Sequence, residues 1–108
     1  MKPPVFEILT WKALKNTSDE AMLAAMSEFS DKVKELPGFR QQSLYKNADN
    51  IWICIYYWHT EQQAHDSNAA VADEPSFQRL MSLIEATSIT MEVLTPLQSS
   101  RRLQFNDD

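Results

Sequence analysis

The spacing of apolar and polar residues along the chain predicts four strands with helices between them. Residues 5–14, 39–46, 51–58 and 87–95 each alternate or run apolar over the length of a strand, and Pro96 ends the last segment. A short stretch rich in Asn and Asp separates the second and third segments and predicts a turn. The expected order is strand, helix, strand, strand, one or two helices, and strand.

The segment between the first two strands has the clearest helical pattern in the chain. Thr17 and Glu20 form a capping-box pattern that predicts where the helix begins. Pro37 and Gly38 predict its end, and the only glycine of the chain stands where a positive φ is favoured. The apolar residues that recur at helical spacing are Met22, Ala25, Met26, Phe29, Val33 and Leu36.

A second helical region follows the third strand. Thr60 and Gln63 form another capping-box pattern, and a helix is predicted from Glu61 to about Ala72. Pro75 fits the first turn of a further helix. The apolar stripe predicted for that helix comprises Phe77, Leu80, Met81 and Ile84.

This order of elements predicts an α+β, ferredoxin-like βαββαβ fold with a four-stranded antiparallel sheet. The third strand is apolar on both faces, whereas a strand with one solvated face alternates apolar with polar residues. The helices of a 108-residue chain can cover one face of the sheet, so we expect a homodimer that packs sheet against sheet. The alternative is a wide core with a few exposed aromatic residues. The two apolar sets are Ile51, Ile53, Ile55 and Tyr57, and Trp52, Cys54, Tyr56 and Trp58.

Length and composition predict one small globular domain, residues 1–96, followed by a polar C-terminal tail, residues 97–108. The net charge of −5 argues against nucleic acid as a partner, because phosphate binding needs a basic surface. No apolar run approaches the roughly 20 residues that span a bilayer, and the first residues show no secretory pattern. The single cysteine, Cys54, excludes an internal disulfide. These features predict a soluble cytoplasmic protein.

The junction between the third strand and the following helix carries the residues best suited to chemistry. His65 shares a predicted helix face with Asn68, Ala69 and Ala72, and small or polar neighbours of this kind leave a hollow beneath a helix. A His and an Asn that face a hollow could bind a carbonyl or a phenol, or move a proton near neutral pH. The alternative is a surface histidine on a weakly amphipathic helix.

Aromatic residues could form the walls of a pocket for a planar ligand, and the alternative for each is packing in the core or at a dimer interface. His59 and His65 do not make a metal site, because no third or fourth ligand follows at a recognisable spacing. There is no glycine-rich phosphate loop and no nucleophile motif. Any chemistry must therefore depend on a mostly apolar pocket with one or two polar groups. The candidate wall residues are Trp58, Trp11, Tyr56 and Phe77.

Residues 5–95 resemble the antibiotic biosynthesis monooxygenase family of dimeric α/β barrels, in element order and in three local signatures. The resemblance implies a protomer that dimerises through its sheet, with a pocket between sheet and helices. It also implies oxygenation of a phenolic aromatic without metal, flavin or other cofactor. His65 matches the family's helix histidine and Trp58 its strand-end tryptophan, while Asn68 rests on the helix-face argument alone. The signatures are Leu36-Pro37-Gly38-Phe39, Tyr57-Trp58-His59-Thr60-Glu61, and Ala64-His65 followed by Pro75-Ser76-Phe77-Gln78-Arg79-Leu80.

The haem-degrading branch of that family is disfavoured. That branch uses an Asn on the first strand, where this chain offers Glu7 and Thr10, and a Trp and a His at positions aligned with Ser67 and Met81. The predicted function is a cofactor-independent monooxygenase of a small quinol-like or polycyclic phenolic substrate. The alternatives are a non-catalytic dimer that binds a small hydrophobic molecule or serves a stress-related role, and an isomerase or cyclase that uses the same pocket.

Overall fold

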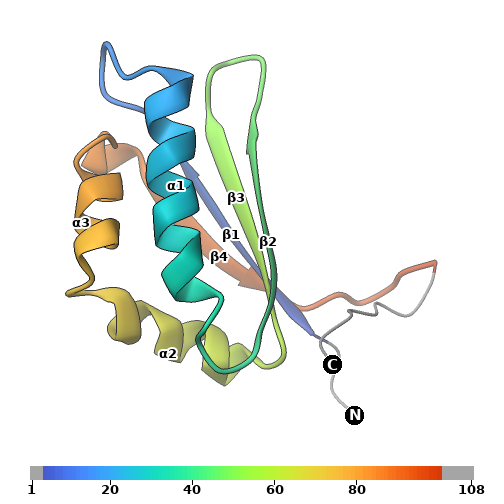
Figure 1. The fold of residues 1–108 in the computed structure, drawn as a ribbon. Helices are drawn as coiled ribbons and strands as arrows, with labels where there is room; N and C mark the ends of the chain where they lie inside the picture. The colour runs from blue at the N-terminus through green and yellow to red at the C-terminus, as the bar shows by residue number, and fades with distance from the viewer. Residues whose placement is uncertain (1–3, 101–108) are drawn as a thin grey trace.

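The computed structural model describes residues 4–100 and consists of one sheet with helices packed on one of its faces (Figure 1). The four strands pair antiparallel throughout, in the order β2-β3-β1-β4. The ferredoxin-like βαββαβ prediction is therefore confirmed. The elements are β1 (Val5–Trp11), α1 (Asp19–Val33), β2 (Phe39–Lys46), β3 (Trp52–Trp58), α2 (Glu61–Val71), α3 (Pro75–Met81), a 3₁₀ turn η1 (Ala86–Ser88) and β4 (Thr90–Leu94).

Helix α1 begins one residue later than the sequence pattern indicates. The N-cap is Ser18, whose hydroxyl oxygen accepts the backbone N–H of Ala21 at 3.1 Å. Thr17 lies in the preceding turn, where its own N–H donates to the carbonyl of Leu14. Two adjacent hydroxyl residues satisfy the same capping preference, so the turn geometry decided between them.

The ends of several other elements also differ from the prediction. Helix α1 ends at Val33 and the chain then turns through Gly38, which has the expected positive φ of 83°. Strand β4 begins only at Thr90, because residues 86–88 form the 3₁₀ turn. The Ser88 hydroxyl in that turn accepts the Lys12 N–H just beyond β1. Element ends depend on such local hydrogen bonds, which apolar spacing does not reveal.

The second helical region follows the predicted pattern closely. Thr60 caps α2, its hydroxyl oxygen accepting the Gln63 N–H at 3.1 Å. Pro75 occupies the first turn of α3, as its fixed φ favours. The Gln63 side chain lies so close to Gly38 that a Cβ there would collide with it. This contact holds the residue before β2 against the first turn of α2.

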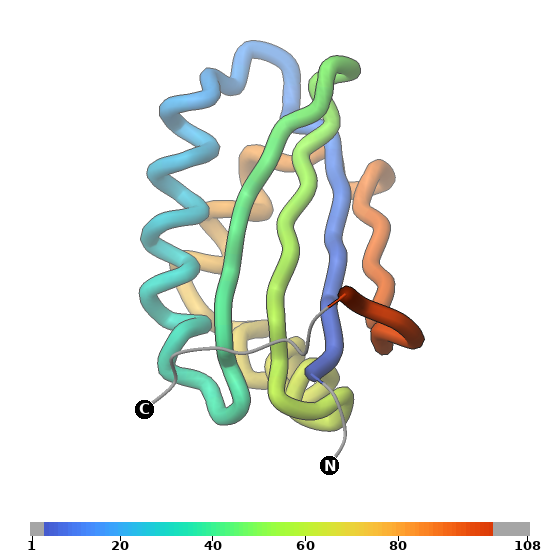
Figure 2. The backbone as a smooth tube through the Cα atoms, turned by 90° about the vertical axis from the view of Figure 1, so that its right-hand side faces the viewer, coloured from blue at the N-terminus to red at the C-terminus, as the bar shows by residue number. Residues whose placement is uncertain are grey.

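The helices cover one face of the sheet and leave the other face open. On β3 the residues that face the helices, Trp52 to Trp58 at every second position, are buried, and those between them are half-buried. Figure 2 shows the sheet from its open side, where no helix of the described chain lies. Phe6 and Tyr57 pack on that face with ring centroids 4.4 Å apart. The packing of a second protomer on this open face stays a prediction.

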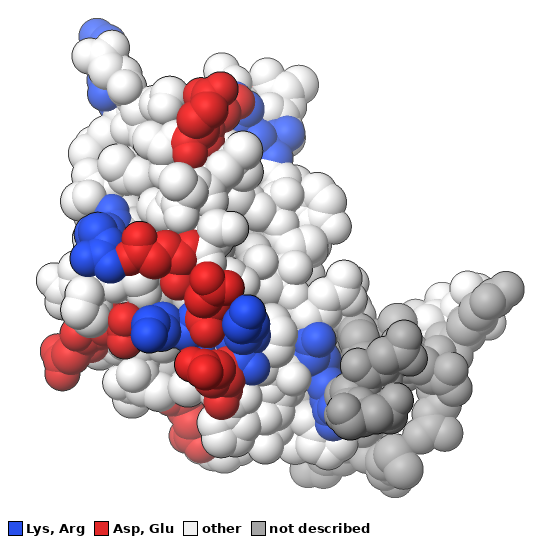
Figure 3. Space-filling model, in the orientation of Figure 1, with Lys and Arg blue, Asp and Glu red and all other residues white. Residues whose placement is uncertain are grey.

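No helix within residues 4–100 is long and apolar enough to cross a membrane. On the face seen in Figure 3, acidic and basic side chains interleave instead of forming a broad field of one sign. Ion pairs at the surface include Lys34 with Asp31 and Arg79 with Glu28. Most of the predicted tail, residues 101–108, lies outside the described residues.

Candidate functional site

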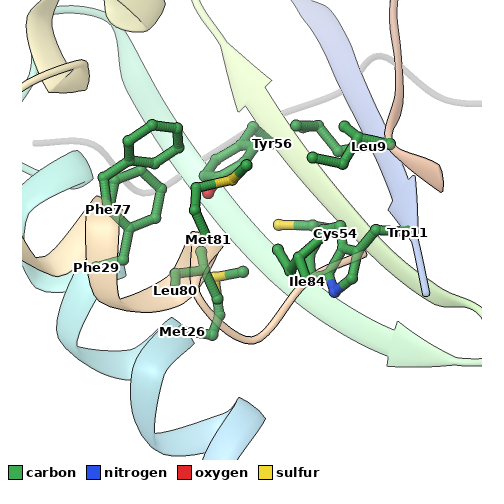
Figure 4. A pocket seen from close by; sticks show the side chains of 11 residues that line it. Leu9, Trp11, Met26, Phe29, Cys54, Tyr56, Phe77, Leu80, Met81 and Ile84 are labelled. Carbon is green, nitrogen blue, oxygen red and sulfur yellow. The ribbon is translucent and has the colours of Figure 1, made fainter. Parts of the chain in front are cut away.

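A cavity of about 50 Å³ lies between the covered face of the sheet and helices α1 and α3 (Figure 4). Its wall is almost wholly apolar because alternate residues of β1 and β3 point inward against the helix stripes. The lining residues are Leu9, Trp11, Met26, Phe29, Cys54, Tyr56, Phe77, Leu80, Met81, Ile84 and Ile89. Three of the four predicted wall residues are thus brought together in one place.

Few polar groups belong to the residues of the cavity wall. The Cys54 sulfur and the Tyr56 hydroxyl point from β3 toward the α3 side chains (Figure 4). Trp11 is 3% exposed, and within residues 4–100 its indole N–H has no hydrogen-bond partner. A buried donor without a partner costs roughly 1–3 kcal/mol, so an acceptor on a ligand would relieve that cost.

The cavity is smaller than an aromatic ring requires. An engineered apolar cavity of about 150 Å³ holds benzene, whereas this one measures about 50 Å³. Phe77 and Met81 on α3 are half-buried and line its wall. Phe77 also packs on Phe29 of α1, with ring centroids 5.4 Å apart. A ring-sized ligand would therefore need some of the lining side chains to move.

A buried carboxyl on β1, Glu7, lies next to this cavity, and the functional interpretation of the sequence missed it. Glu7 is 3% exposed, and its Oε1 accepts the indole N–H of Trp58 at 3.0 Å. Its other oxygen, Oε2, is buried and has no hydrogen-bond partner within residues 4–100. Glu7 pairs across the sheet with Tyr56 and stands two residues before Leu9, both of which line the cavity.

The electrostatic surroundings of Glu7 act in two directions. Burial raises the pKa of the Glu7 carboxyl above its ordinary value of 4.5. The Trp58 indole N–H, the charge of His65 and the side chain of Asn68 act to lower that pKa. Asn68 lies near enough for this effect without hydrogen-bonding geometry to Oε2. The two predicted catalytic residues therefore lie near a carboxyl and do not line the cavity.

The predicted inward face of α2 is wrong by one residue. Ala64, Ser67 and Val71 point inward, while His65 and Asn68 are exposed. Thr60 fixes the start of the helix, and one residue further along a helix points about 100° away. The hollow expected beneath Ala69 and Ala72 does not exist, because these residues are exposed as well.

His65 lies at the surface, with its side chain 53% exposed, and its Nε2 is 3.3 Å from a carboxylate oxygen of Glu61 one turn earlier. The aromatic candidates have separate roles. Trp58 does not line the cavity, and instead stacks on Tyr56 and meets the edge of Phe39. Within residues 4–100 no group of three or more His, Cys, Asp and Glu side chains is arranged to hold a metal ion.

Cys54 is a buried thiol, and we predict that it is unreactive in the folded protein. Burial raises its pKa to about 11, although the Gln42 amide opposes this. At pH 8 we expect reaction with a disulfide reagent to be about 100-fold slower or more than in urea-unfolded protein, because the thiolate is scarce and shielded. Thiol release followed at 412 nm measures this; equal folded and unfolded rates would contradict it.

The architecture is shared with solved structures, although no protein-family model and no curated protein matches the sequence. SnoaB, a cofactor-independent oxygenase from Streptomyces nogalater, superposes with a TM-score of 0.76 at 15% identity. The alignment covers 91% of this chain and 97% of SnoaB. This chain has the SnoaB fold.

Two further structures, provisionally described as antibiotic biosynthesis monooxygenases, share that fold. The one from Bordetella bronchiseptica has a TM-score of 0.78 at 9% identity, over 90% of this chain and 100% of that one. The one from Nitrosomonas europaea has a TM-score of 0.72 at 13% identity, over 90% and 93%. The fold expected from the resemblance is therefore confirmed. The superpositions establish the fold that this chain shares with SnoaB. Because the sequence identities are low, the activity must be argued from the site.

Proposed function

We propose that this chain is a cofactor-independent monooxygenase of a small quinol-like or polycyclic phenolic compound. The apolar cavity beside a buried carboxyl is the observation that carries the proposal, because it offers dry surroundings for a ring and a group that can take a proton. The likeness to SnoaB, whose fold hosts such chemistry, adds support. The reaction would need a deprotonated substrate that gives an electron to dioxygen.

The lining residues suggest how such a substrate would bind. Its ring would lie between Tyr56 and Phe77 after displacement of Met81, where aromatic faces and edges pack favourably. An oxygen substituent on that ring would accept a hydrogen bond from the Trp11 indole N–H, which has no partner among residues 4–100. Trp58 would support the site from behind through its contacts with Tyr56 and Glu7.

The predicted roles of His65 and Asn68 are retained in modified form. Both lie at the outer side of Glu7, where each lowers the pKa of that carboxyl. His65 is exposed, so its imidazole could receive a proton from inside and release it to water. Asn68 would orient the carboxyl without exchanging protons.

We also propose that the protein works as a homodimer whose two sheets pack on each other. The open face carries a block of large apolar side chains, and contiguous apolar patches of this kind mark interaction sites. These side chains come from β1, β3 and β4, which are adjacent strands of the sheet. The apolar residues of this face are Phe6, Ile8, Ile53, Ile55, Tyr57 and Leu94.

Dioxygen uptake with a panel of reduced quinones and anthrone-type phenols tests the proposed activity. We expect uptake above the autoxidation rate, lowered about 10-fold or more in His65→Ala if the histidine handles the proton. His59→Ala is the matched control, because the His59 ring bonds to Arg40 and does not line the cavity. No uptake with any compound would contradict the oxygenase, and turnover under nitrogen would indicate an isomerase or cyclase instead.

A further inference from the structure

Glu7 is an acidic residue at a buried position whose neighbours on the same face of β1 are apolar. The residues that share its face of β1 are Val5, Leu9 and Trp11, all apolar and packed into the core. A carboxyl there loses its hydration, and one hydrogen bond from Trp58 replaces only part of it. Packing alone would favour an apolar side chain of similar volume at this position. The fold gains nothing evident from the acid, which suggests that the acid serves a site.

The free oxygen of Glu7 is placed where a ligand can use it. Oε1 is held by the Trp58 indole, which fixes the orientation of the carboxyl and leaves Oε2 without a partner among residues 4–100. Two residues that line the cavity are neighbours of Glu7 in the sheet: Leu9 two positions along β1, and Tyr56 opposite Glu7 on β3. A ring-sized ligand needs more than the present 50 Å³, and movement of these two side chains would extend the cavity toward Glu7.

We propose that Glu7 is the proton acceptor of this site, and that the ligand is an aromatic molecule whose hydroxyl reaches Oε2. The ligand O–H bond breaks, an O–H bond forms on Glu7, and the electron pair stays on the ligand as a phenolate. The inference rests on the proposed function for the fate of that phenolate, since dioxygen is its oxidant there. The proton transfer itself needs no further reactant.

The charged and titratable groups around Glu7 fit this role. Tyr56 and Cys54 on β3 are buried, and burial keeps both in the neutral form by raising the pKa of each. On α2, His65 attracts negative charge at Glu7 and is itself paired with Glu61 at the surface. From β4 the cross-strand partner of Glu7 is the apolar Val93. Among the described groups that act on Glu7, His65 is the one that carries a positive charge when protonated, and it lies on the side toward solvent.

The first test follows the Trp58 indole N–H by NMR, because it reports directly on the carboxyl that it binds. We expect its resonance to titrate with a midpoint above 4.5, since burial raises the pKa of Glu7. Glu7→Gln keeps an acceptor for the indole and should abolish the titration. The indoles of Trp11 and Trp52 serve as internal references. A midpoint at or below 4.5, or no titration between pH 4 and pH 9, would overturn the inference.

The second test compares dioxygen uptake in Glu7→Gln and in Glu35→Gln, where Glu35 is exposed after α1. We expect the first variant to lose about 10²–10⁴-fold in kcat and the second to keep its rate. Native uptake should rise with pH through the Glu7 midpoint, because only the carboxylate accepts a proton. Unchanged uptake in Glu7→Gln would overturn the inference and leave the oxygenase standing. A raised Trp58 midpoint without uptake in the native chain would instead overturn the oxygenase.

Discussion

Replacing Ile55 with lysine is expected to convert the proposed sheet-to-sheet dimer into a folded monomer. Ile55 lies in the middle of the open sheet face, paired with Ile8 on β1 and with Ser43 on β2. In a sheet-to-sheet dimer, the two-fold operation brings this region of one protomer close to the same region of the other. A lysine there would place a charge in an apolar interface, so we expect dimer affinity to fall about 100-fold or more.

Sedimentation velocity across a concentration series measures this change. Leu23→Lys is the matched control, because Leu23 is a 52% exposed apolar residue on α1, on the opposite side of the molecule. That variant should sediment as the native chain does, and both variants should keep the native far-ultraviolet circular dichroism. A native chain that stays monomeric at all concentrations, or an Ile55→Lys variant that still dimerises, would contradict the sheet-to-sheet dimer.

The strand and helix pattern was predictable because burial on a pleated or helical surface has a simple period. Alternation on β3 correctly separated Trp52 and its buried partners from Ile53 and the open face. The Thr60 cap was also found, since one hydroxyl stood alone before the helix. The Ser18 cap was missed because Thr17 offered the same chemistry one position earlier, and only the turn before it distinguishes the two.

The site was less predictable because it depends on contacts between distant segments. Glu7 is the single acid on the helix-facing side of β1, and an acid among three apolar residues was a signal available in the sequence. Its partner Trp58 is 51 residues away, so the hydrogen bond could not be deduced. The inward face of α2 was misjudged because that helix has few large apolar residues, and alanine, serine and histidine give a weak period.

The hydrogen bond between Trp58 and Glu7 is expected to have the largest effect on stability of the contacts around the site. Trp58→Phe removes the one hydrogen-bond donor that residues 4–100 place on the buried Glu7 carboxyl. We expect the free energy of unfolding at pH 7 to fall by about 2–4 kcal/mol beyond the loss of ring contacts. Urea unfolding followed by circular dichroism measures it. Trp11→Phe is the control, since it removes similar ring atoms and an indole N–H without a partner among residues 4–100.

The pH dependence of that loss identifies its origin. Because the folded-state pKa of Glu7 is raised, the folded chain binds this proton more tightly than the unfolded chain does. The stability contributed is fully present below about pH 4.5 and is lost as the pH rises through the folded-state pKa.

Trp58→Phe should steepen this decrease, since the indole lowers that pKa, and the deficit should shrink toward pH 4. Adding Glu7→Leu should recover most of the deficit at pH 7, because this position then holds no carboxyl to bury. A deficit that is independent of pH, or one that Glu7→Leu leaves unchanged, would assign the cost to packing of the Trp58 ring.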